Sequence, residues 1–154
     1  MMDTTTTVET IAPVVRQAQT RLAPAEAFRL FTDRVNEWWP LPSHSVWGDE
    51  AAACRMEAQA GGRFYETHRD GRECEWGRVL AWEPPRRLVF SFYPGRAPAE
   101  ATEVEVIFEP ADAGTRLTLT HRGWENRGER ALAVREGYVT GWALVLGHFE
   151  RVSA

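Results

Sequence analysis

The last stretch of the chain carries the most regular hydrophobic pattern. Between Asn126 and Val152 the apolar positions recur at steps of three or four residues, the spacing of one face of an α-helix. These positions are Ala131, Val134, Tyr138, Trp142, Val145, Phe149 and Val152. Asn126 followed by Glu129 has the form of a capping box at a helix start. The pattern predicts one long amphipathic helix over residues 126–152.

Gly137 and Gly141 lie inside this helix. Each lowers helix propensity by about 1 kcal/mol relative to alanine. We therefore expect a broad group to pack closely against the helix beside Tyr138 and Trp142. The opposite face carries arginines and glutamates, so the helix is expected to lie on another part of the protein rather than in a membrane.

Most of the remaining chain has the alternating pattern of β-strands. Strands are predicted over residues 11–22, 53–58, 63–68, 74–82, 87–93, 103–108 and 116–121. Gly61-Gly62, Asp70-Gly71 and Asp112-Ala113-Gly114 supply turns between neighbouring strands. Two short helices are predicted after the first strand, one over residues 24–31 and one carrying Trp38 and Trp39, with a loop over residues 40–49.

This order of elements predicts an α+β helix-grip fold. Tight turns between successive strands indicate an antiparallel sheet, and a sheet with one apolar face must bury that face. The long C-terminal helix is the element able to cover it, so a curved sheet of about seven strands is expected to wrap around this helix. The element order is one strand, two short helices, six strands and the long helix. Residues 11–154 are predicted to form a single domain after a disordered tail, residues 1–10.

Composition excludes several classes of function. The net charge is −4 with no basic stripe, which argues against a nucleic-acid partner. No apolar run is long enough to span a membrane and no signal peptide is visible, so the protein is expected to be cytoplasmic, with Cys54 and Cys74 as free thiols. The four histidines lack metal-ligand spacing and no nucleotide-binding glycine motif occurs, so we expect neither a metal nor a cofactor.

Seven tryptophans and seven phenylalanines can fill a core or line a pocket. Tyr138 and Trp142 lie one turn apart on the apolar helix face, where they either present polar groups to a ligand or fill the core. Trp38 and Trp39 are adjacent and cannot face the same way: either one closes the mouth of the cavity, or both belong to the core.

Glu66 and His121 are the candidates for catalysis. His121 shares its phase with Leu117 and Leu119 and is expected to face inward, as a base, as a hydrogen-bond donor to a ligand, or as a structural histidine. Glu66 shares its phase with Phe64, which favours an inward carboxylate, although a shift of one residue would reverse this. The phase of residues 74–82 is undecided, because both of its faces are apolar, and such a strand can have its outer face covered by a second subunit.

These considerations give one set of predicted ligand-binding residues. They are Trp39, Phe64, Glu66, Val79, Phe90, Phe92, Val106, His121, Tyr138 and Trp142. The predicted partner is a small hydrophobic or aromatic ligand, and a homodimer is plausible.

Several segments also resemble a known family. PAEAFRLFTD followed by EWWP, then GGRFYE, DGRECEWGRVLAWEPPRRLVFSF, TEVEVIFEP with GTRLTLTHRGW, and REGYVTGWALVLGHF occur in family order over residues 12–152. The chain thereby resembles the SRPBCC (START/birch-pollen-allergen-like) superfamily, in its branch of activator-of-heat-shock-ATPase homologues. The resemblance implies the helix-grip fold and a cavity for a hydrophobic ligand. Two other functions are compatible with the same fold. The first is an enzyme of the cyclase, dehydratase or hydrolase type that uses the same cavity, and the second is a co-chaperone-like interaction module.

Overall fold

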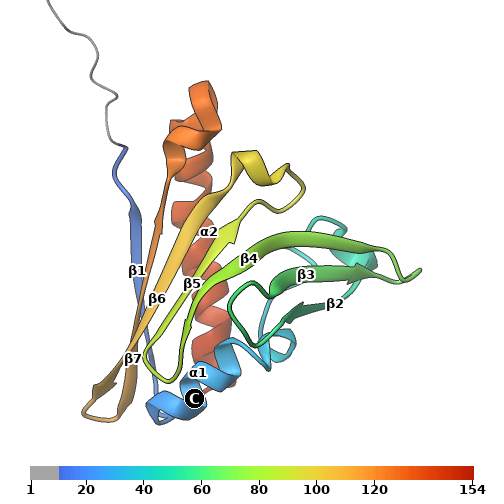
Figure 1. Ribbon diagram of the computed structural model, residues 1–154. Coiled ribbons are helices and arrows are strands. Elements are labelled where there is room, and N and C mark those ends of the chain that lie inside the picture. Colours follow the sequence, from blue (N-terminus) through green and yellow to red (C-terminus); the bar gives the residue numbers. More distant parts are fainter. Residues whose placement is uncertain (1–10) are drawn as a thin grey trace, which may run out of the picture.

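The computed structural model describes residues 11–154 and contains one seven-stranded antiparallel sheet and one long helix (Figure 1). The strands are β1 (Val14–Thr20), β2 (Ala51–Met56), β3 (Arg63–His68), β4 (Glu73–Glu83), β5 (Arg87–Phe92), β6 (Thr102–Ala111) and β7 (Gly114–Arg122). The α-helices are α1 (Pro24–Phe31) and α2 (Ala131–Val152), and short 3₁₀ segments are η2 (Val35–Glu37), η3 (Gly48–Glu50), η4 (Pro98–Glu100) and η5 (Trp124–Arg130). Among these elements no helix has the length and apolar character needed to cross a membrane. The predicted tail, residues 1–10, lies outside the described residues.

The sheet has the order β1-β7-β6-β5-β4-β3-β2. Strands β2 to β7 follow one another as antiparallel neighbours, and β1 pairs with β7 at the far edge, so the predicted helix-grip architecture is confirmed. Figure 1 shows β1, β7 and β6 running along α2, while β2, β3 and the outer part of β4 turn away from it. The curved sheet therefore has one face toward the helix and one face toward solvent.

Alternation in β6 explains why this sheet packs on a helix. Val104, Val106 and Phe108 are at most 1% exposed, whereas Glu103 and Glu105 between them face outward and pair with Arg122. On the helix side, Phe149 is fully buried, and its ring contacts those of Phe31 and Trp38. The core therefore lies between the concave face of the sheet and α2, with α1 closing one end.

The helix begins later than its hydrophobic pattern predicts. Residues 124–130 form η5, which is kinked at Gly128, where the backbone is non-helical (φ 60°, ψ −134°), and α2 begins only at Ala131. The side-chain amide of Asn126 donates to the carbonyl of Ala101 at 2.8 Å instead of capping the helix. The predicted capping box of Asn126 and Glu129 is therefore wrong, because a tertiary hydrogen bond takes the capping side chain.

The predicted buried face of α2 is also too long at its C-terminal end. Val152 is 48% exposed, so its assignment to this face is wrong. The helix ends there, and its terminus is joined to β1 by polar contacts: the Thr20 hydroxyl donates to the carbonyl of Ser153 at 3.1 Å.

Two register shifts explain why the phase of β4 could not be read from its sequence. The pairing with β3 shifts between Phe64 and Tyr65, and the pairing with β5 shifts between Val79 and Ala81. Such β-bulges insert an extra residue and change which side chains face inward. Trp76 and Val79 are consequently both buried although they stand three positions apart.

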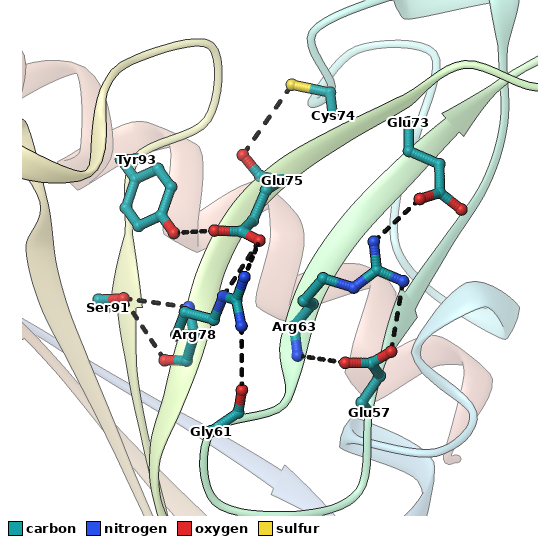
Figure 2. A network of polar contacts seen from close by, with 9 residues as sticks. All are labelled: Glu57, Gly61, Arg63, Glu73, Cys74, Glu75, Arg78, Ser91 and Tyr93. Atoms are coloured by element: carbon teal, nitrogen blue, oxygen red, sulfur yellow. Dashed lines mark hydrogen bonds and ion pairs between the residues drawn. The ribbon is translucent and has the colours of Figure 1, made fainter.

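The outer face of β3, β4 and β5 is polar (Figure 2). Arg63 bridges Glu73 and Glu57, and Arg78 pairs with Glu75 at 2.9 Å. The Tyr93 hydroxyl donates to Glu75, and burial together with this carboxylate raises the pKa of Tyr93 to about 12. Leu80 is exposed on this side of β4, and the prediction that a second subunit covers the strand stays a prediction. A pocket for an apolar ligand is therefore expected on the concave side.

Candidate ligand pocket

A pocket of about 400 Å³ opens between the middle of α2, strands β4 and β5, and two loops. Five aromatic side chains form much of its wall: Trp39, Trp76, Phe92, Tyr138 and Trp142. The helix adds Gly141 and Val145, and the loops add Ser43, His44, Ser45, Val46, Pro94 and Gly95. The wall is therefore mainly aromatic, and the polar side chains that line it are those of Ser43, His44, Ser45 and Tyr138.

The structure brings four of the predicted ligand-binding residues to this pocket and leaves six outside its lining. Trp39, Phe92, Tyr138 and Trp142 line it. The other six, each at most 1% exposed, are Phe64, Glu66, Val79, Phe90, Val106 and His121. The sequence predicts that these six side chains line a cavity, but they pack against other core side chains instead. Phe64, for example, packs against Trp76 with ring centroids 4.9 Å apart. The free volume is accordingly displaced toward the loops.

Sequence reasoning missed the contribution of the loops. Residues 43–46 lie in a stretch that the sequence identifies only as a loop, and Pro94 and Gly95 lie in the loop that follows β5. Trp76 was missed because its strand phase was undecided. One signal was available in Gly141, whose missing side chain leaves room for the imidazole of His44, 3.8 Å from where a Cβ would stand. The matching expectation for Gly137 is wrong, since, apart from its chain neighbours and its own helix backbone, no atom of residues 11–154 lies within 4 Å of its Cβ position.

The three indole N–H groups in the wall are all used inside the protein. Trp39 donates to the carbonyl of His44 at 2.8 Å, Trp76 to Glu66 at 2.6 Å, and Trp142 to His121 at 2.9 Å. Each bond fixes the orientation of its ring. The rings thus present apolar surface to the pocket, and Trp142 has no free N–H for a ligand.

Glu66 organises the loop that covers the pocket. Its carboxylate is fully buried and accepts hydrogen bonds from the indole of Trp76 and from the backbone N–H groups of Val46 (2.6 Å) and Trp47 (3.2 Å). A buried carboxylate needs such donors, because burial without them is costly. Glu66 therefore joins β3, β4 and the loop of residues 41–48 at one point.

His121 is held by its two neighbours. Because the Trp142 N–H donates to Nδ1, the second ring nitrogen carries the proton and faces the hydroxyl of Thr102 at 2.6 Å, which in turn donates to the carbonyl of Phe92. Burial lowers the pKa of His121 to about 3, with a smaller contribution from the charge of Arg127. This arrangement describes a neutral histidine with both ring nitrogens engaged within the protein.

Two titratable side chains line the pocket itself. Nδ1 of His44 lies 2.7 Å from the hydroxyl of Ser43, and burial, assisted by the charge of His148, lowers the pKa of His44. Burial raises the pKa of Tyr138, although Arg127 acts in the opposite direction. At neutral pH the pocket therefore holds a neutral imidazole and a protonated phenol.

The chemistry of the other reactive groups is limited. Cys54 and Cys74 are free thiols, and burial followed by the charge of Glu66 raises the pKa of Cys54 to about 12. Within residues 11–154, no three histidine, cysteine or acidic side chains come together in a way that could hold a metal ion. The side chains of His44, Ser43 and Tyr138 in the pocket are able to form hydrogen bonds and to exchange protons.

The curved sheet, the long helix and the aromatic pocket between them define a helix-grip protein of the SRPBCC superfamily. A family model, described as activator of Hsp90 ATPase homolog 1-like protein, matches residues 21–153. The chain belongs to this family. None of the curated proteins matches it.

Solved structures of the same fold cover almost the whole chain. An anthrahydroquino-γ-pyrone synthase, Txn09, is 32% identical, with a TM-score of 0.64 over 93% of this chain and 97% of the synthase. Protein MLL2253 from Mesorhizobium loti is 21% identical, with a TM-score of 0.66 over 90% of this chain and 94% of that protein. Protein BH1534 from Bacillus halodurans is 16% identical, with a TM-score of 0.67 over 94% and 99%. The last two share the fold alone.

Replacing Glu66 by glutamine should loosen the loop that covers the pocket. A glutamine NH₂ group would face an N–H donor, so we expect a loss of about 1–3 kcal/mol in the free energy of unfolding. Hydrogen exchange at the Val46 and Trp47 amides should accelerate at least tenfold. Glu109→Gln, at an exposed position with a 3.8 Å contact to Arg116, is the control and should change stability by less than about 0.5 kcal/mol. Equal effects of the two variants would contradict this role of Glu66.

His121 should make stability depend on pH. In the folded protein its pKa is about 3, whereas the ordinary value is 6.5, so acid protonates the unfolded chain first. Stability is therefore lost as pH falls below 6.5, by up to about 1.4 kcal/mol per pH unit. Urea unfolding at several pH values should give a steeper slope for the wild type than for His121→Gln. Parallel slopes would show that His121 does not titrate in this way.

Proposed function

We propose that this protein binds a small, flat aromatic ligand in the pocket beneath the loop of residues 41–48. The observation that carries the proposal is the chemistry of the wall. Trp39, Trp76 and Trp142 have their N–H groups occupied within the protein, so their rings offer apolar and π surface for stacking. A ligand of matching shape would gain this contact without leaving indole N–H groups unpaired.

The size and polarity of the pocket support the same ligand class. Its volume of about 400 Å³ lies within the range of small-molecule sites and would hold a molecule of two or three fused rings. Polar contacts would come from His44 with Ser43 at the loop and from Tyr138 on the helix. These groups would orient the ligand, while the aromatic wall would supply most of the affinity.

A cyclase-type enzyme is the second candidate. It is favoured by the 32% identity to the anthrahydroquino-γ-pyrone synthase and by the neutral imidazole of His44 in the pocket. His44 would remove the proton of a phenolic hydroxyl as its oxygen adds to an unsaturated carbon, and the proton would end on the neighbouring carbon. A C–O bond forms, one carbon–carbon π bond is lost, and the product is an isomer of the substrate. The co-chaperone alternative draws support only from the family description.

Filling the pocket should abolish binding. Gly141→Leu places a side chain beside the imidazole of His44, whereas Gly137→Leu, one turn earlier in the same helix, places it in open space. Both changes raise helix propensity, so they form a matched pair. In tryptophan-fluorescence titrations with 2-naphthol, 2-naphthamide and flavone, we expect Gly141→Leu to weaken binding at least tenfold and Gly137→Leu to leave it unchanged. Equal affinities in both variants would place the ligand elsewhere.

The enzyme candidate can be tested with ortho-hydroxyphenyl ethynyl ketone, which isomerises to chromone, a benzo-γ-pyrone. Appearance of chromone above the buffer rate, reduced about a hundredfold or more in His44→Ala, would support general base catalysis by His44. Gly141→Leu should block the reaction, and Gly137→Leu should not. A rate equal to that of buffer, together with tight binding of the neutral aromatic compounds, would favour a binding protein.

A further inference from the structure

Next to Tyr138, one of the residues that line the pocket, lie two buried hydrogen-bond donors that have no acceptor among the described residues. The ring of Trp124 packs against that of Tyr138 with centroids 5.4 Å apart. Trp124 is fully buried, and within residues 11–154 its Nε1 has no hydrogen-bond partner. The Nη2 atom of Arg127 is likewise buried without a partner. Buried polar atoms are nearly always hydrogen-bonded, so two unpaired donors beside one pocket require an explanation.

Arg127 is fixed in place but not neutralised. Its Nε donates to the backbone carbonyl of Glu100 at 2.8 Å. This bond joins η5 to the segment between β5 and β6, near the N-terminal end of α2 (Figure 1). The carboxylate of Glu100 pairs instead with Arg96 at 3.0 Å. Among the described residues, Arg127 forms no ion pair with any carboxylate, whereas Arg122, on the neighbouring strand, contacts both Glu103 and Glu105.

The charge of Arg127 reaches the pocket. Burial raises the pKa of Tyr138, and Arg127 lowers it, through its charge and through a contact with the Tyr138 hydroxyl. The charge of Arg127 also adds to the lowering of the pKa of His121 by burial. A partly buried guanidinium without a counter-ion favours an anionic oxygen, because its N–H groups form strong charge-assisted hydrogen bonds with carboxylates. The site lacks such an oxygen among its own side chains.

We propose that Arg127 and the Tyr138 hydroxyl form a subsite for the carboxylate of the bound ligand, with the Trp124 N–H as a further donor nearby. The ligand class is then an aromatic carboxylate, with its rings against Trp142 and its anionic end at η5. This inference rests on the proposed function, since it concerns the polar end of the same pocket. A purely structural Arg127 would instead tether the loop of residues 94–101 and would not distinguish charged from neutral ligands.

The test compares two probes of equal shape, 2-naphthoate and 2-naphthamide, by isothermal titration calorimetry on the full chain. The wild type should bind the carboxylate at least tenfold more tightly than the amide. Arg127→Ala should weaken 2-naphthoate about 10- to 100-fold and change 2-naphthamide less than about threefold. Arg130→Ala, an exposed position in the same segment, is the matched control and should affect neither probe.

A second variant separates the subsite from loss of structure. Tyr138→Phe keeps the aromatic ring and removes the hydroxyl, so it should weaken 2-naphthoate several-fold and spare 2-naphthamide. Circular dichroism would establish that each variant is folded, and Tyr138→Phe carries the test if Arg127→Ala unfolds. Equal binding of both probes by the wild type, or equal losses for both in the folded variants, would overturn the subsite and leave the proposed function standing. Binding of neither probe would overturn both.

Discussion

The pocket depends on the hydrogen bonds that the buried carboxylate of Glu66 accepts. This carboxylate has no cationic partner among the described residues and is stabilised by N–H donors from Trp76, Val46 and Trp47. A charge buried in this way holds its donors firmly, because each one lost would leave the carboxylate less compensated. The loop of residues 41–48 is therefore attached to the sheet by backbone groups, and it can present His44 to the pocket although its own structure is irregular.

Aromatic packing decides how much of the space between sheet and helix stays open. Rings from α1, β3, β4, β5 and α2, together with Trp38 and Trp39 after η2, contact one another in a continuous cluster, so much of the helix-grip interior is core. The pocket is what remains where Gly141 and the loops replace bulky side chains. Proteins of this fold can thus differ in ligand while keeping the same framework, because the framework and the pocket use different residues.

The electrostatics of the pocket are uneven along its length. On one side, the bonds between Trp142, His121, Thr102 and Phe92 form a neutral, internally satisfied chain. At the end near η5, Arg127 contributes a positive charge that no carboxylate of the described residues neutralises. Much of the wall is apolar, so this charge acts in surroundings of low dielectric constant, where its influence on a bound anion would be greater than in water. An asymmetry of this kind would orient the proposed ligand as well as contribute to its binding.

The sequence by itself determined the order of elements, the antiparallel sheet, the long C-terminal helix and the inward direction of His121, because these follow from local periodicity and turn chemistry. For Glu66 it only favoured the inward direction, since a shift of one residue would have reversed it. Tertiary structure decided the rest. The bulges that turn both Trp76 and Val79 inward arise from pairing with neighbouring strands, and the start of α2 at Ala131 depends on Asn126 bonding to a distant carbonyl. Only packing in three dimensions separates pocket residues such as Trp142 from core residues such as Phe64, since whether space stays empty depends on side chains far apart in the chain.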